Sequence, residues 1–438
     1  MAKTKTKGKK SSKTPTGNVD IIMYDVGFGD CYLLTFPYAD GTVRRVLIDC
    51  GSLTEKSKAW AEQLMGLITE DCRPRKGAPA HLDALVITHR HLDHLGALQF
   101  KSTRQAMEAL QPKVVILPWV EHPDVERGDT GPPVGVSRLA LAQLASLDLA
   151  HSLAEAVTQN PAALSASVPS ALRERVMSLA AYNVKNRDTI EWLNTLGAER
   201  CYAFTGADAK LAEVLPGVKV TVLGPPKADD QPEIMGRPAE NSDQYWELRR
   251  SLAAALEKTG LAKPRADALF AGAPTIPIAE AAPVAAWVIK RLDDADVGNL
   301  LRIMEMLDDA VNNTSVILLF EVGGKLLLFS GDAQWENWQY VLEKKPGLAG
   351  DLPRVNLYKV GHHGSHNATP VKLWDQFTNR GDAKKPKRLV ALLSTADVTS
   401  YPQVPRCSLL CALQKQSHLV TNYPPQERKD IRIPYELR

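Results

Sequence analysis

The stretch Thr88-His89-Arg90-His91-Leu92-Asp93-His94 decides how this chain folds. It follows the apolar run 84–87, which is typical of a buried β-strand, so polar side chains begin where a strand ends. Its three imidazoles and one carboxylate are ligand types that Zn²⁺ prefers and that also suit Mn²⁺ or Fe²⁺. His89 and His91 share one direction, whereas Asp93 and the histidine after it lie beyond a bend. The spacing therefore predicts that all four side chains bind one or two divalent cations.

A second carboxylate follows a later strand. The β-rich runs 315–321 and 325–329 flank Gly323-Gly324, which is a strong two-residue hairpin signal. The second run ends at Ser-Gly-Asp332, and a carboxylate at a strand end is able to bridge two cations. We therefore expect Asp332 to join the metal site.

Adjacent histidines follow a third strand. The run 355–360 is typical of a strand and leads into Gly-His362-His363-Gly-Ser365-His366. Because neighbouring side chains diverge, we expect one of the two adjacent histidines to bind metal directly. We assign His362 as the ligand, because it comes first after the strand, and His363 as a catalytic residue that orients or protonates the substrate. Ser365 and His366 are candidates for substrate contact or proton transfer, and are equally well explained as polar loop residues.

The rest of the chain is β-rich at both ends and helical in the middle. The β runs at the ends are 19–24, 31–36, 43–48, 388–393 and 418–421. The segments with helical spacing are 137–158, 170–182, 242–258 and 280–292, and two short β runs, 114–117 and 218–223, interrupt the middle of the chain. This alternation predicts an α/β fold, a layered αββα sandwich over residues 19–438 with a largely helical insertion at about 119–310.

Composition is that of an ordinary globular protein. The chain has 438 residues, of which 44% are hydrophobic and 24% charged, and its net charge is +3. Lysines alternate with Thr, Ser and Gly in residues 1–18, which we interpret as a disordered basic tail, solubilising or in weak contact with a polyanion. No apolar run approaches the ~20 residues that a spanning helix needs, so we expect a cytoplasmic protein without membrane contact.

The His-x-His-x-Asp-His pattern resembles the signature of the metallo-β-lactamase superfamily. Other segments are similar to the hydrolase domain of ComEC-type competence proteins. They are residues 19–51, Asn312-Asn313-Thr314-Ser315-Val316, Phe329-Ser330-Gly331-Asp332 and Lys359-Val360-Gly361-His362-His363-Gly364-Ser365.

The resemblance implies an αββα metallo-β-lactamase fold with one or two divalent metal ions, Zn or Mn. For this branch it also implies phosphodiester hydrolysis of DNA or a related substrate by a metal-activated water, which Asp93 or Asp332 would orient. Asp25 and Asp49 would lie under the metal site and fix its loop. A nucleic acid or another phosphodiester is then the expected partner, and a protein partner in a multi-component system is equally compatible.

The chain departs from the family pattern in three places. The branch often has Asp at the position of His91, so the site here is closer to that of the wider superfamily. The superfamily's separate histidine before the bridging aspartate has no clear counterpart, because only His122 and His151 lie in that interval. The usual Gly-His-Pro near the C-terminus is replaced by Tyr-Pro-Gln-Val-Pro at 401–405.

Two alternatives to the phosphodiesterase hypothesis remain at this point. One is a cytosolic hydrolase of a small ester, thioester, lactam or cyclic nucleotide, which would use the same metal-activated water. The other is a regulatory or binding protein that keeps the fold without turnover. The size of the substrate would distinguish the first alternative from the phosphodiesterase hypothesis. The metal content of the protein would distinguish the second alternative from both enzymes.

Overall fold

The computed structural model describes residues 15–16, 18–74, 77–123, 138–159, 170–184, 186–231, 234, 294–365, 367–398, 401–424 and 432–437. Several predictions therefore lie outside the described residues. These are most of the basic tail, the helices expected at 242–258 and 280–292, and the position of His366.

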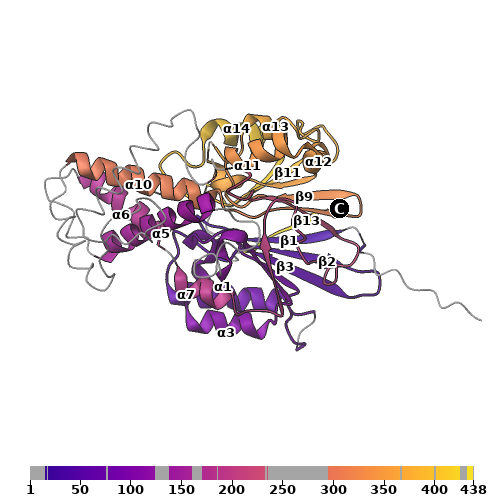
Figure 1. The fold of residues 1–438 in the computed structure, drawn as a ribbon. Helices are drawn as coiled ribbons and strands as arrows, with labels where there is room; N and C mark the ends of the chain where they lie inside the picture. The colour runs from indigo at the N-terminus through magenta and orange to yellow at the C-terminus, as the bar shows by residue number, and fades with distance from the viewer. Residues whose placement is uncertain are drawn as a thin grey trace, which may run out of the picture.

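Within the described residues, seven strands form a first sheet in the order β13-β1-β2-β3-β4-β5-β6 (Figure 1). β1, β2 and β3 pair antiparallel, and β3 to β6 pair in parallel. β13, which the sequence did not reveal, pairs with β1. The strands are β1 (Val19–Tyr24), β2 (Tyr32–Pro37), β3 (Val43–Ile48), β4 (Ala84–Val86), β5 (Val114–Pro118), β6 (Glu199–Ala203) and β13 (Arg432–Leu437).

The second sheet has six described strands in the order β12-β11-β10-β9-β8-β7. The predicted hairpin joins β8 to β9, and Gly323 and Gly324 take the positive φ angles, 55° and 78°, that such a turn requires. β9 to β12 run in parallel. The strands are β7 (Lys219–Gly224), β8 (Ile317–Val322), β9 (Lys325–Phe329), β10 (Leu357–Lys359), β11 (Val390–Leu393) and β12 (His418–Thr421).

The two sheets pack face to face and helices cover their outer faces (Figure 1). Apolar side chains of both sheets, such as Phe36 and Phe320, form the core between them. A second core joins the first sheet to α1 (Lys58–Asp71), α3 (Lys101–Ala109) and α7 (Arg187–Leu193). A third joins the other sheet to α11 (Trp335–Gln339), α13 (Val371–Trp374) and α14 (Cys407–Gln416). The predicted αββα sandwich is therefore confirmed.

Burial explains the strand sequences. All three residues of β4 are buried, because one face of the strand meets the opposite sheet and the other meets helices. Such two-sided burial selects a continuous apolar run instead of alternation. The run that precedes Thr88 is short and entirely apolar for this reason.

Three helices pack beside the sandwich at one end (Figure 1). They are α5 (Arg138–Gln159), α6 (Ser170–Tyr182) and α10 (Asp294–Asn312). Leu153, Leu179 and Leu307 lie in their shared apolar cluster. α5 and α6 match the helices expected at 137–158 and 170–182, while β6 and β7, inside the same stretch of sequence, return to the sheets. The limits of the insertion stay a prediction.

Among the described residues, none of the helices has both the length and the apolar character needed to cross a membrane.

Candidate metal centre

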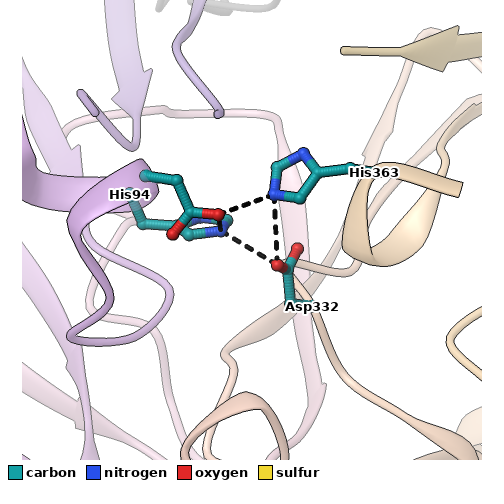
Figure 2. A group of neighbouring side chains, drawn as sticks. His94, Asp332 and His363 are labelled. Carbon is teal, nitrogen blue, oxygen red and sulfur yellow. Dashed lines mark hydrogen bonds and ion pairs between the residues drawn. The ribbon is translucent and has the colours of Figure 1, made fainter. Parts of the chain in front are cut away.

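Strand ends from both sheets meet at one end of the sandwich. His89 follows β4, Asp332 follows β9, and His363 follows β10. Figure 2 shows His94, from the first half of the chain, facing Asp332 and His363 from the second half. A polar cluster at the carboxyl ends of parallel strands is the usual position for a ligand site in α/β proteins.

Glycines let the loops of the site approach one another. A Cβ atom on Gly51 would lie 2.5 Å from the backbone carbon of Asp93, far inside van der Waals contact. Gly331 has a φ of 51°, and a Cβ atom there would lie 2.9 Å from the Cβ of Thr88. Larger residues would therefore push apart the segments that carry Asp93 and Asp332.

One group of potential ligands contains Asp93, His94, Asp332 and His363, whose ligand atoms all lie within 4.8 Å of one another. The Nε2 atom of His363 is 2.9 Å from Asp93 Oδ2 and 3.3 Å from Asp332 Oδ2. The Nε2 atom of His94 is 3.1 Å from Asp332 Oδ2. All four side chains are fully buried. Two imidazoles and two carboxylates thus converge on one point, as the ligands of a divalent cation do.

A second group contains His89, His91 and Asp93, so Asp93 belongs to both groups. The Nε2 atom of His89 and the Nδ1 atom of His91 lie 3.0 Å apart. His91 donates from Nε2 to the amide oxygen of Asn183, and the other ring nitrogen of His89 lies 3.2 Å from the hydroxyl oxygen of Ser315. Each ring therefore keeps one nitrogen toward its neighbour and the other on a protein oxygen.

The two histidines of the first group are oriented in the same way. His94 donates from Nδ1 to Asp49 Oδ2 over 2.8 Å, and His363 donates from Nδ1 to the carbonyl oxygen of Ser394 over 3.0 Å. Asp49 is itself fixed by the backbone N–H and the hydroxyl of Thr88. Hydrogen bonds from the outer ring nitrogen to an oxygen are typical of metal-binding histidines.

A buried lysine supplies a fixed positive charge behind the site. Lys359 is 2% exposed, and its ammonium pairs with Asp30 and lies 3.2 Å from Asp332 Oδ1. Burial alone would lower its pKa, but Asp30 and Asp332 raise it above the usual value. Lys359 is therefore charged at neutral pH.

Without a bound cation, protons on His94 and His363 balance the negative charges of Asp93 and Asp332. Burial alone would raise the pKa of Asp93, but His94 and His363 lower it to about 2. Burial alone would lower the pKa of His363, but Asp332 and Asp93 raise it to about 10. The pKa of His94 is raised well above its usual value by Asp332 and Asp93, against the effect of burial. Burial lowers the pKa of His91 to about 4, so this ring stays neutral.

Aromatic side chains cover the site. The hydroxyl of Tyr182, at the end of α6, donates to both carboxylate oxygens of Asp93, each over 2.8 Å. The ring of Phe28 lies 4.2 Å from that of His363 and stacks on Tyr401 at 5.7 Å. Tyr401 donates to Asp308 of α10 over 2.9 Å. The helices beside the sandwich and the 401–405 segment thus close the centre together.

The structure places most of the predicted site residues in these groups. His89, His91, Asp93, His94 and Asp332 lie together, and Asp49 holds Thr88 and His94. His363, rather than His362, faces the first group. Which of the two binds metal, and which is catalytic, stays a prediction.

Other predicted residues lie elsewhere. Asp25 accepts hydrogen bonds from Asn422 and from the backbone of Gly27, inside its own loop region. Ser365 donates to Asn367. His122 packs on the ring of Tyr202, and His151 bonds to the carbonyl oxygen of Asn183. Neither of these two histidines belongs to a described ligand group.

Sequence reasoning missed several residues of the centre. Lys359 offered a signal, because a charged residue ends an otherwise apolar strand. Asp30 lies in the quoted segment that resembles ComEC, but was not singled out. Tyr182 and Asn183 offered no signal. Tyr182 is 89 positions from its partner Asp93, and Asn183 is 92 positions from its partner His91.

The comparison with known families agrees with this geometry. Residues 24–148 match the family model of the metallo-beta-lactamase superfamily. This part of the chain is similar to the metallo-beta-lactamase superfamily and contains the cluster from His89 to His94. No curated protein matches the chain. The superfamily match and the buried His and Asp groups indicate a metal-dependent hydrolase.

We predict that Lys359→Met lowers the free energy of unfolding of the metal-free protein by about 3–5 kcal/mol, because it leaves Asp30 and Asp332 without their buried cation. Urea unfolding followed by tryptophan fluorescence measures the change. Lys372→Met is the matched control, because Lys372 forms an exposed pair with Glu343 and should cost less than about 1 kcal/mol. Equal, small effects of the two variants would contradict a structural role for Lys359.

We predict that divalent cations displace protons from His94 and His363. Because the pKa of His363 is raised to about 10, its proton remains bound at pH 7.5 and is lost only as the pH rises through that value. Cation affinity should therefore rise with pH up to about 10. Calorimetric titrations with Zn²⁺ in buffers of different ionisation enthalpy count the released protons, which should fall in His363→Ala. Binding without proton release would show that these imidazoles are not the ligands.

Proposed function

We propose that this protein is a metal-dependent phosphodiesterase that acts on a nucleic acid or another phosphodiester. One observation carries the proposal: two groups of buried His and Asp side chains share Asp93, and the first of them contains a second carboxylate, Asp332. Inward-facing imidazole nitrogens and carboxylate oxygens are donors that fit Zn²⁺ or Mn²⁺. When bound, such cations supply Lewis-acid activation of water and of a phosphoryl oxygen.

The protein's own residues orient the reactants. Asp93 and Asp332 accept protons or hydrogen bonds at the point where the two groups meet, which is where an attacking water would be held. The hydroxyl of Tyr182 already donates to both carboxylate oxygens of Asp93, each over 2.8 Å. His363 remains our candidate for holding charge that develops on the substrate, either as a ligand or by direct contact.

The charge of the cluster favours an anionic substrate. With neutral imidazoles, the carboxylates of Asp30, Asp49, Asp93 and Asp332 and the ammonium of Lys359 leave a net charge of about minus three in a fully buried region. One divalent cation would leave the region negative, and two would make it positive. A doubly loaded centre would therefore attract a phosphodiester more strongly than a neutral ester.

The similarity to the hydrolase domain of ComEC-type proteins also supports phosphodiester chemistry. The quoted segments now lie together, because Asn312 is 3.1 Å from His91 and Lys359 pairs with Asp332. Residues of that similarity thus surround the metal groups, and are not scattered over the fold. We extend the similarity to substrate class only.

A small phosphodiester such as a cyclic nucleotide is the second candidate. This candidate is supported by the burial of the site. Every residue of the two ligand groups is fully buried, and Phe28, Tyr182 and Tyr401 lie over the groups. A polymer would have to displace this cover along its length, whereas a small substrate requires only a local opening.

We predict that the metal-loaded protein cleaves labelled DNA or RNA and that Asp93→Asn lowers the rate more than about 100-fold. The loss should exceed the 10- to 100-fold cost of altering a residue that only supports a ligand. Single- and double-stranded substrates and a cyclic dinucleotide are compared with Mn²⁺ or Zn²⁺, at equal metal occupancy.

His418→Ala, at an exposed position far from the ligand groups in sequence, is the control and should retain the wild-type rate. Cleavage of the cyclic dinucleotide alone would favour the small-substrate candidate. An absence of cleavage of any phosphodiester by metal-loaded wild type would overturn the proposed function and leave the ester hydrolase or the non-catalytic alternative.

A further inference from the structure

Both ring nitrogens of His362 lack a hydrogen-bond partner among the residues that the structure describes, although the side chain is only 4% exposed. Every other buried histidine that the structure describes bonds through at least one nitrogen: His89, His91, His94, His151 and His363. An unsatisfied buried polar group costs about 1–3 kcal/mol, so such a group calls for an explanation. The unpartnered imidazole of His362 is therefore free, with respect to the described residues, to bind a partner such as a cation.

The backbone keeps this ring at the metal centre. The N–H of His362 donates to Asp332 Oδ1 over 3.1 Å. His362 and His363 both have positive φ angles, 41° and 51°, which side chains other than glycine rarely adopt. Consecutive residues in this conformation turn the two rings in different directions, and the ring centres lie 6.0 Å apart with an interplanar angle of 70°. The strain is compatible with a functional placement of both rings.

The surroundings of His362 include the second ligand group. Besides burial, the groups that shift the pKa of His362 are Asp332, His363, Asp93 and His91, and the pKa of His89 responds to His362 in turn. His362 therefore lies within electrostatic range of His89 and His91, and its ring contacts those of His363 and Tyr401. Tyr401 bounds the ring on another side at 5.9 Å.

The second ligand group contains only two nitrogen ligands of its own. His89 and His91 offer two imidazoles, and the remaining member, Asp93, also serves the first group. Cation sites in proteins are usually built from three or four protein ligands. His122 and His151 are engaged elsewhere, so among the described histidines His362 is the buried imidazole still available for this group.

We propose that His362 is the third nitrogen ligand of a cation held by His89 and His91, so that the two adjacent histidines serve different cations. The proposal rests on the metal dependence of the proposed function and not on its substrate. In this structure the ring of His362 lies outside the groups whose ligand atoms approach within 4.8 Å, so binding requires the ring to turn toward His89 and His91.

The test is the metal stoichiometry of the full chain, measured with Co²⁺ alone by calorimetry, by elemental analysis after dialysis, and by the visible absorption of bound Co²⁺. Wild type should bind two equivalents. His362→Ala should bind one equivalent normally, while binding of the other weakens by at least about 100-fold. His418→Ala is the control and should bind two.

Double variants show which of the two cation sites is lost in His362→Ala. His89→Ala/His362→Ala should retain the one equivalent that each single variant retains, whereas His362→Ala/His363→Ala should lose both. The thermal unfolding of metal-free His362→Ala should match that of wild type, because the ring has no partner to lose; this separates a lost ligand from a misfolded variant.

Two equivalents of wild-type affinity in His362→Ala would overturn the proposal, as would a wild type that binds a single equivalent unaffected by His362→Ala. Because each readout measures binding, failure to cleave any phosphodiester would contradict the proposed function and leave this result unchanged.

Discussion

The Asp332 carboxylate is the constraint on which the centre depends. It is fully buried, and a buried carboxylate without nearby positive charge costs several kcal/mol. Nitrogen atoms of His94, Lys359 and His363 lie 3.1 to 3.3 Å from its oxygens. His94 comes from the first half of the chain, and Lys359 and His363 come from the second half. Apolar packing holds the two sheets together over most of their area, but at this end their alignment is set by charge. The positions of His94 and His363 therefore follow from the need to neutralise this carboxylate.

The segments outside the sandwich complete this arrangement. Tyr182 and Asn183 at the end of α6 bond to Asp93 and His91, and Asp308 of α10 accepts a hydrogen bond from Tyr401. The same side chains that orient the ligands thus also cover them. A substrate would therefore meet Tyr182, Asp308 and Tyr401 on its way to the ligands, and these residues lie outside the His-x-His-x-Asp-His motif. The fold and the ligands are consequently easier to infer than the substrate.

The sequence predicts the features that depend on residues close together in the chain. The strand runs, the Gly323-Gly324 hairpin and the His89 to His94 cluster are local patterns, and the structure contains each of them. The choice between His362 and His363 is not local, because the positive φ angles of both residues decide where their rings point. The role of Tyr182 depends on packing between segments far apart in the chain, for which a single sequence carries no signal.

Lys359 limits how many cations the centre can hold. By geometry alone, Asp30, Asp49 and His94 form a third group of potential ligands. The ammonium of Lys359 already pairs with Asp30, and His94 already donates to Asp49, so both carboxylates of this group have a partner within the protein. A cation there would meet a fixed positive charge in a region of low dielectric constant. This charge favours the two groups that share Asp93 as cation sites, and Tyr182 covers that shared carboxylate.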